Sequence, residues 1–518
     1  MAAALLSRPA VIGIALACSG VPSVAFAHGY AAPFSPPLPL AWYLAAAGTA
    51  VLVSFVVSHA VSRSGIADAI LPSYGLGLGH FETQSLRHRV VGYASYATAR
   101  GAQFTSVVLF LCVVGAAFVG NSNPIHNLAP TFIWVIFWIG VPIISAVFGD
   151  IWSVVNPWKI LYQIAEFATE RIPGHRPESW VAAYRPSWDV WPAVLLFFCF
   201  AWVENVYPDS IVPFHLGVII VVYSAITWGG MFIFGRETWL RYGDPFSVFF
   251  SLIARCSIVQ PSRRCSSTSG SESASPVGYP RESRARNTCV GKTRSESPGI
   301  RFRMPGSGVI GQGESSAALM IFVLLVLSTM TLDGFLATTI WTDIRMQLSQ
   351  VVSSITLIGS LALLAAPIMF YLAFQACMAL SASAGHLDLT SVFAARVFVI
   401  TLLPIAVVYH IAHFHSFLLI QGQAIVPLIS DPFGWGWDLF GTASYRLNPT
   451  VVSPHASWLF TVAVIVAGHV VAVYAAHAVA RRRATSGTSL FRGQLPVLLL
   501  MTGYTVLSLW IMGQPMMK

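Results

Sequence analysis

Three histidines, His410, His413 and His415, lie within six residues at one end of a long apolar run, VFAARVFVITLLPIAVVYHIAHFHSFLLIQGQ. An imidazole inside a membrane span costs free energy unless a metal ion, a proton path or a bound anion satisfies its polar atoms. Neutral imidazoles at positions i and i+3 suit Zn²⁺, Cu²⁺ or Fe²⁺. The cluster is therefore the best indication of chemistry in the sequence, and a divalent metal, zinc or copper, is the expected cofactor.

Helix geometry limits how these histidines can act together. His410 and His413 share one face of a helix, whereas His415 points nearly opposite if the helix continues. All three can bind one ion only if the helix ends or distorts near His413, and Gly422 and Pro427 favour non-helical backbone soon after it. The competing interpretation is that the three are interfacial groups bonded to backbone carbonyls or water.

A second polar segment, DPFGWGWD, follows the histidines and contains two carboxylates and two indoles. Asp431 or Asp438 could add a metal ligand or act as the general base, and Trp435 and Trp437 could hold an aromatic part of a substrate. The alternative is an interfacial tryptophan belt with an N-cap aspartate. Asp333, at the end of another apolar run, is expected to be a cap or turn residue.

The elements that position these residues are predicted to cross a membrane. The chain has 518 residues, of which 56% are hydrophobic and 9% charged, whereas a soluble protein carries about 25% charged residues. The net charge of +9 does not indicate a nucleic-acid partner, because most basic residues lie in short segments between apolar runs. The expected partner is the lipid bilayer, with a small apolar substrate.

Apolar runs long enough to cross the bilayer predict an all-α bundle of about ten transmembrane helices. They occur near 39–61, 102–120, 129–149, 189–206, 212–234, 317–335, 354–381, 391–412, 457–479 and 495–513. Alternate connecting segments hold 24 lysines and arginines, and the remaining ones hold three. This asymmetry predicts that the basic segments are cytoplasmic, so that both mature termini lie on the periplasmic side of a bacterial inner membrane.

Composition divides the chain into four parts. Residues 1–27 are expected to be a cleavable signal peptide ending in Ala-Phe-Ala, which would leave His28 as a possible copper ligand. Residues 28–255 and 314–518 are predicted to form two membrane halves of about five spans each. Residues 256–313, rich in serine and arginine, are predicted to be a disordered cytoplasmic linker, and an out-of-frame stretch of the gene is a second explanation.

Two of the basic segments resemble each other. Asn156 precedes Pro157 and Asp244 precedes Pro245, which is the signature of a helix start. The helices they start, roughly 157–170 and 245–255, are expected to lie against the inner interface. In the apolar run 457–479, His469 and His477 fall on nearly one face and could line a polar seam, although histidines at helix interfaces are commoner.

Several motifs together resemble a known family. They are an Ala-His-Gly start after the signal, Asn-Pro-Trp at 156–158, Glu-Thr-Trp-Leu at 237–240, Asp-Gly-Phe at 333–335 and HFHSFLLIQGQ at 413–423. This combination resembles the bacterial polytopic membrane proteins labelled fenitrothion hydrolase, over most of the chain except 256–313. The resemblance implies hydrolysis of an organophosphate triester such as fenitrothion, with release of a nitrophenol and a dialkyl thiophosphate.

Two further functions remain open from the residues. The same histidines could bind cargo in a membrane protein that handles a metal such as copper or another solute, or the chain could be structural. For hydrolysis, a metal-bound water would be the nucleophile, with His410, His413 and His415 as its ligands. No P-loop, GxSxG motif or dinucleotide-type glycine loop is present in the sequence.

Overall fold

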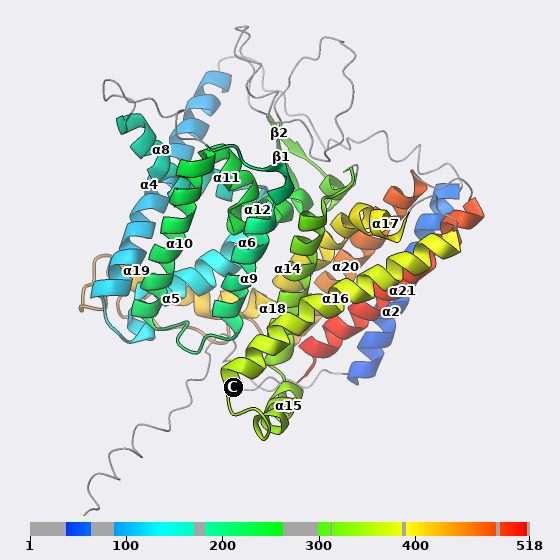
Figure 1. Ribbon diagram of the computed structural model, residues 1–518. Coiled ribbons are helices and arrows are strands. Elements are labelled where there is room, and N and C mark those ends of the chain that lie inside the picture. Colours follow the sequence, from blue (N-terminus) through cyan, green and yellow to red (C-terminus); the bar gives the residue numbers. More distant parts are fainter. Residues whose placement is uncertain are drawn as a thin grey trace, which may run out of the picture.

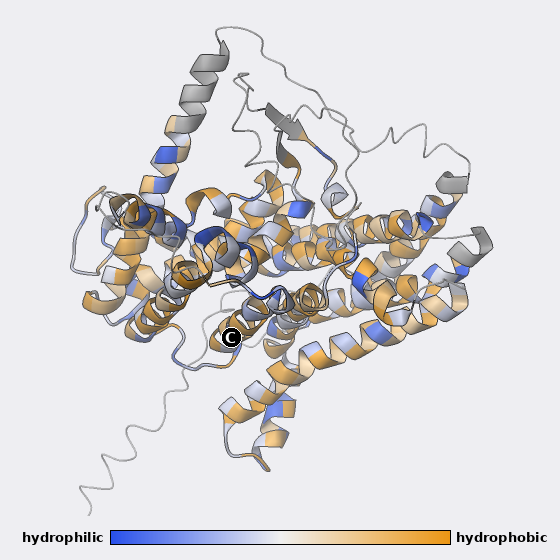
Figure 2. Cartoon of the chain, turned by 45° about the horizontal axis from the view of Figure 1, so that its top comes forward, coloured by the Kyte–Doolittle hydropathy of each residue, from blue (hydrophilic) through white to orange (hydrophobic). Residues whose placement is uncertain are grey.

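The computed structural model describes residues 38–63, 87–169, 182–262, 299–310, 313–385, 390–482 and 487–514. The predicted signal peptide and His28 lie outside these ranges. The protein is an all-α bundle, and ten of its helical segments are long and apolar enough to span a membrane. This confirms the predicted fold class and each of the ten predicted spans. Hydrophobic residues predominate along the length of these helices (Figure 2).

Eight of the spans are built on a single long helix, and the fourth span also includes the short turn η4 (Pro186–Trp188). These are α2 (Leu40–Arg63), α4 (Arg87–Val119), α9 (Trp191–Asn205), α10 (Pro213–Phe234), α14 (Ala317–Leu336), α16 (Ile355–Gly385), α20 (Pro454–Arg481) and α21 (Gly487–Met512). The other two are compound. The third is α5 (Leu128–Thr131), the π-helix η2 (Phe132–Gly140) and α6 (Val141–Phe148). The eighth is α17 (Ser391–Phe398), η8 (Val399–Leu402), α18 (Leu403–Gln421), η9 (Gly422–Ala424) and α19 (Ile425–Ser430).

Two helices lie between two groups of spans (Figure 1). One group contains α4, α9, α10 and the third span, and the other contains α2, α16, α20 and α21, with α14 and α18 between them. Burial agrees with this position: 83% of the α14 span and 72% of the eighth span are buried, against at most 44% in any other span. Side chains on α14 and α18 are therefore shielded from lipid on most sides.

The grouping in space differs from the order along the chain. The first span, α2, packs against α20 and α21, which are the last two spans. The apolar residues Val51 and Phe55 on α2 are almost completely buried by this contact. The first span of the predicted half 28–255 therefore packs with helices of the other predicted half, 314–518.

The described parts of the basic segments lie at one end of the bundle, which we call the basic face. Four short helices lie there: α7 (Trp152–Val155), α8 (Pro157–Thr169), α11 (Arg236–Tyr242) and α12 (Pro245–Ile253). The predicted starts of α8 and α12 are confirmed, because Asn156 accepts a hydrogen bond from the Lys159 amide and Asp244 accepts one from the Ser247 amide. Burial raises the pKa of Asp244.

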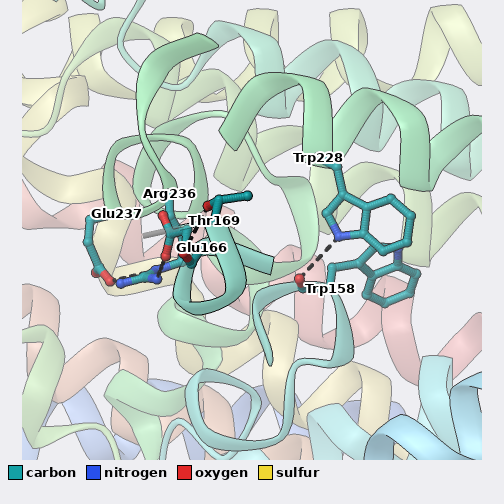
Figure 3. Close-up of polar contacts among 6 residues, drawn as sticks. All are labelled: Trp158, Glu166, Thr169, Trp228, Arg236 and Glu237. Carbon is teal, nitrogen blue, oxygen red and sulfur yellow. Dashed lines mark hydrogen bonds and ion pairs between the residues drawn. The ribbon is translucent and has the colours of Figure 1, made fainter. Parts of the chain in front are cut away.

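Contacts across the basic face join the two similar segments (Figure 3). Arg236, at the start of α11, forms an ion pair with Glu166 on α8 and a second one with Glu237. The Trp228 indole on α10 donates a hydrogen bond to the Trp158 carbonyl at 3.1 Å. The interfacial helices are thus fixed to the spans rather than held only by lipid.

Both ends of the segment 256–313 are ordered parts of this face. Strands β1 (Val259–Ser262) and β2 (Gly299–Phe302) form an antiparallel pair in which Ser262 is opposite Gly299. Arg303 donates hydrogen bonds to the Ala254 and Ser257 carbonyls at 2.6 and 2.8 Å. The predicted linker therefore begins and ends in packed structure, and residues 263–298 lie outside the described ranges.

The other end of the bundle, the opposite face, carries the C-terminal ends of the central helices α14 and α18. The helix α15 (Thr339–Ser349) and a loop over residues 431–452 lie there. Short turns complete the described chain: η1 (Pro124–His126), η4 (Pro186–Trp188), η5 (Ala254–Cys256) and η7 (Ser307–Val309). The predicted metal ligands His410, His413 and His415 lie on α18, and Asp431, Trp435, Trp437 and Asp438 lie in the loop that follows α19.

Candidate functional site

The three histidines of α18 face three different neighbours. The helix continues without a break through all of them to Gln421, so the distortion that would let them converge does not occur. His413 faces Asp333 on α14, His410 faces the third span, and His415 faces Ser457 on α20. The side chains therefore belong to separate environments.

His413 and Asp333 form a buried pair between the two central helices. The Nε2 atom of His413 lies 2.9 Å from Oδ2 of Asp333, and the two side chains are 1% and 10% exposed. The structure corrects the expectation for Asp333, because this residue lies within α14, not at its cap, and turns its carboxylate into the bundle. An imidazole and a carboxylate in contact can share or exchange a proton.

A small residue beside the pair allows the two helices to approach closely. The Tyr409 ring stacks on His413 with ring centres 6.0 Å apart, and Tyr409 is 1% exposed. A Cβ atom at Gly334 would lie 2.6 Å from the Tyr409 hydroxyl and 3.5 Å from His413. Gly334 is therefore required for the position of both rings next to α14.

A second carboxylate, Glu204, lies on the neighbouring helix α9. It lies one residue before the end of α9 and interacts electrostatically with Asp333. The Asn205 amide donates to its Oε2 at 3.3 Å, and the Trp138 indole lies next to it, although the Trp138 nitrogen makes no hydrogen bond of normal length. Sequence reasoning missed Glu204, and the available signal was a lone carboxylate at the end of an apolar span.

His410 lies deeper in the bundle than the pair. It is 1% exposed, and its Nε2 donates a long hydrogen bond of 3.4 Å to the Ile139 carbonyl in η2. Its ring packs edge to face against Trp138 with centres 5.7 Å apart. His410 therefore connects α18 to the third span.

His415 makes a separate contact near the opposite face. Its Nδ1 donates to the Ala412 carbonyl at 2.9 Å, because a carbonyl can only accept. Its Nε2 is then the acceptor for the Ser457 hydroxyl at 2.8 Å, and Ser416 lies 2.5 Å from Ser457. His415 and Ser457 are half-buried, so this pair is closer to water than the Asp333 pair.

The carboxylates of the loop 431–452 bond to its own backbone. Asp431 accepts hydrogen bonds from the Trp435 and Gly436 amides at 3.0 and 2.7 Å. Asp438 accepts from the Ala443 amide and from the Ser430 hydroxyl, and these bonds lower its pKa.

The two indoles of this loop form an exposed aromatic group. Trp435 and Trp437 are 52% and 40% exposed and pack against Phe433. The Phe433 carbonyl accepts a hydrogen bond from the Asn121 amide, which fixes the loop to the end of α4. The geometry suits an interfacial aromatic surface.

The described residues contain no group of three or more His, Cys, Asp or Glu side chains that could hold a metal ion. The ligand set expected from the sequence, His410, His413 and His415, is divided among three environments and does not fit one ion. The arrangement that the structure does build is the buried pair of Asp333 and His413.

No family model, no curated protein and no solved structure matches the chain. Sequence and structure together show a polytopic helical membrane protein with ten candidate spans.

Proposed function

We propose that the protein is a membrane transporter that binds and passes a proton through the cluster of Asp333, His413 and Glu204. This is the sequence-based alternative of a solute- or metal-handling membrane protein, with the proton as the ion that the cluster binds. The observation that carries the proposal is the Asp333–His413 contact between the two most enclosed spans.

The cost of such a pair supports a functional use. Desolvating each ion costs several kcal/mol, and apolar side chains of similar volume are often as stable or more stable. Charged residues inside membrane spans mark ion pathways and proton relays for the same reason. The carboxylates of Asp333 and Glu204 and the imidazole of His413 can each gain or lose a proton. The number of protons bound in the interior of the protein can therefore change.

The positions of the residues suggest how the site exchanges protons. Glu204 lies near the end of α9 at the opposite face, and Asp333 lies in the last turn of α14. A proton that enters on Glu204 can pass to Asp333 and then to His413, which is buried deeper along α18. Tyr409 and Gly334 hold the imidazole ring in place for this transfer.

The test is proton uptake by liposomes that contain the purified protein and a trapped pH-sensitive dye, driven by a potassium diffusion potential. Wild-type protein should acidify the lumen faster than protein-free liposomes. Asp333→Asn and His413→Gln should each lower the rate about tenfold or more, because an amide side chain cannot take up and release the proton that a carboxylate or an imidazole exchanges. His415→Gln is the matched control on the same helix and should retain the wild-type rate.

Rates are compared only for variants that elute as the wild type does in detergent. Wild-type liposomes no faster than empty ones would overturn the proposal. It would equally fail if the Asp333 and His413 variants matched the His415 variant, since the pair would then have no part in transport.

The family resemblance supports a second candidate function, hydrolysis of organophosphate triesters such as fenitrothion. The observation that favours it is the Ser457–His415 hydrogen bond, because a histidine that accepts a serine proton activates the serine oxygen. That oxygen would bond to phosphorus while the bond to nitrophenol breaks, and His415 would take the hydroxyl proton. Water would then release the dialkyl thiophosphate from Ser457.

Nitrophenol release from an aryl phosphotriester tests this candidate. Ser457→Ala and His415→Gln should abolish turnover, and Asp333→Asn should not. Addition of a chelator tests whether nitrophenol release needs the zinc or copper predicted from the sequence. Asp431→Asn and Asp438→Asn test whether it needs the predicted general bases. Absence of nitrophenol release from wild-type protein would remove the candidate.

A further inference from the structure

A cluster of aromatic rings at the basic face joins three separate parts of the chain. The Tyr184 ring stacks on the Tyr242 ring of α11, with ring centres 5.7 Å apart. It makes edge-to-face contacts with Trp188 in η4 and with Phe234, the last residue of α10, at 5.8 and 5.4 Å. We call these four rings the Tyr184 cluster. It lies where α9 begins and α10 ends, beside α11 (Figure 1).

The segment that carries Tyr184 is fixed by hydrogen bonds of the backbone and of Tyr184 itself. The Ala182 amide donates to the Ile233 carbonyl at 2.7 Å, which joins the segment to the end of α10. The Tyr184 hydroxyl donates to the Asp189 carbonyl at 2.6 Å. Asp189 has a φ of 39°, the one positive value at a non-glycine position within the described ranges. The fold therefore sets the shape of this surface, and a ligand that binds it has few further groups to order.

Two arginines lie on the rings of the Tyr184 cluster. The Cζ atom of Arg185 is 5.7 Å from the centre of the Trp188 ring, and that of Arg241 is 5.4 Å from the centre of the Tyr242 ring. Both arginines are exposed. A guanidinium that lies over a ring keeps its N–H donors in its own plane, where they can reach an acceptor in solution or in a lipid. Phosphate oxygens match this planar arrangement of donors.

The charge of Arg185 is not offset by an ion pair within the described part of the chain. Arg236, which also lies on α11, differs in this respect, because it pairs with Glu166 and Glu237. Asp189 is the carboxylate closest to Arg185 in sequence, and it turns its Oδ2 atom into the protein. The surface of the Tyr184 cluster therefore carries a positive charge that an anion can neutralise.

The residues next to the Tyr184 cluster place it at the boundary between water and lipid. Trp188 and Trp191, at the start of the α9 span, are 39% and 47% exposed. Leu195, one turn further along α9, is 64% exposed. Exposed indoles at the end of a membrane span lie at the level of the lipid headgroups. Arg185 precedes these indoles in the chain, so its guanidinium lies beside the phosphates, and the exposed side of α9 lies beside the acyl chains.

We propose that Arg185 and Arg241 bind the phosphate of an anionic phospholipid in the leaflet at the basic face. The guanidinium groups donate N–H bonds to the phosphate oxygens, and the acyl chains lie along Trp191 and Leu195. A phosphatidylglycerol headgroup brings a negative charge and no cation. A phosphatidylcholine headgroup carries a trimethylammonium group that the arginines repel. This lipid site goes beyond the proposed transport function and does not depend on it.

Native mass spectrometry of the purified full chain in detergent tests the proposal by titration with phosphatidylglycerol or phosphatidylcholine of the same acyl chains. Wild-type protein should bind its first phosphatidylglycerol at least about tenfold more tightly than phosphatidylcholine. Arg185→Gln and Arg241→Gln should each weaken phosphatidylglycerol binding about fivefold, the usual contribution of one basic side chain at a membrane surface. Arg446→Gln, which removes the same charge from an exposed site on the opposite face, should bind as the wild type does.

Three results would overturn the lipid site in variants that elute as the wild type does. The first is equal affinity of the wild type for the two lipids. The second is phosphatidylglycerol binding by Arg185→Gln and Arg241→Gln that matches binding by Arg446→Gln. The third is displacement of the lipid by an excess of inorganic phosphate, which would show that the arginines bind a free anion. Because acyl chains contribute to the affinity of the lipid, phosphatidylglycerol should remain bound in that excess.

Discussion

At the residue scale, the Asp333–His413 pair depends on the absence of a side chain at position 334. The Tyr409 hydroxyl occupies the space that a Cβ atom would need. Gly334→Ala should therefore separate α14 from α18 and lower stability by about 1–3 kcal/mol, the usual effect of overpacking. Thermal unfolding in detergent measures the stability, and proton uptake should fall with the His413–Asp333 contact.

Two further variants test whether the loss of stability comes from the clash with Tyr409. Gly229 lies in α10, where a Cβ would meet no atom within 4 Å, so Gly229→Ala should be neutral or slightly stabilising. Adding Tyr409→Phe to Gly334→Ala removes the clashing hydroxyl and should restore part of the lost stability. A Gly334→Ala protein as stable as the Gly229→Ala protein would contradict this account of the helix contact.

Asp438 gives a prediction that depends on pH. Hydrogen bonds from the Ala443 amide and the Ser430 hydroxyl lower its pKa. The stabilisation of the loop is therefore complete above the ordinary aspartate pKa of about 3.9 and is lost as the pH falls through the lower folded-state value. Asp438→Asn should make residues 431–452 easier to cleave by protease at neutral pH.

Acid should remove the difference between wild type and this variant. At a pH below the lowered folded-state pKa of Asp438, both loops should be cleaved by pepsin at similar rates. A wild-type loop that stays protected there, while the Asp438→Asn loop is cleaved, would show that the carboxylate does not hold the loop through its ionised form.

At the scale of elements, the strand pair β1 and β2 indicates which residues of the basic face can be replaced without loss of folding or proton uptake. Ser262 and Gly299 are opposite each other in the pair, so a short turn can join them. Replacing residues 263–298 with Asn-Gly, which favours a two-residue hairpin, should leave expression, elution in detergent and proton uptake near wild type. Changing Arg303 to Ala should be far more damaging, because its guanidinium bonds to the Ala254 and Ser257 carbonyls. Loss of uptake in a well-folded deletion protein would place a function in 263–298.

At the scale of the whole molecule, the distribution of basic residues predicts the orientation. Reporter fusions at residue 300, on the basic face, should be cytoplasmic, and fusions at residue 440 should be periplasmic. A cytoplasmic reporter at residue 440 would invert the orientation and reverse the direction in which the proposed path runs.

Sequence patterns predicted the ten spans because each apolar run is long and the charges lie between the runs. They could not predict which spans are central, since the mean hydropathies of the α14 span and the eighth span, 2.2 and 2.3, hardly differ from the 2.2 of the α4 span and of the third span. The three histidines were identified, but their partners Ile139, Asp333 and Ser457 are 42 to 271 residues distant along the chain. Only helix packing brings such residues together, and for the same reason Glu204 was missed.

The pairing of β1 with β2 also has a practical consequence. Neighbouring strands lie ~4.8 Å apart, so positions 262 and 299 can accept a compact protein whose own termini are close together. A rigid insert there would stand out from the basic face of a protein otherwise dominated by membrane helices. Such an insert would serve as a fiducial mark for aligning particles in electron cryo-microscopy, and its rotation between images would report whether the two helix groups move relative to each other.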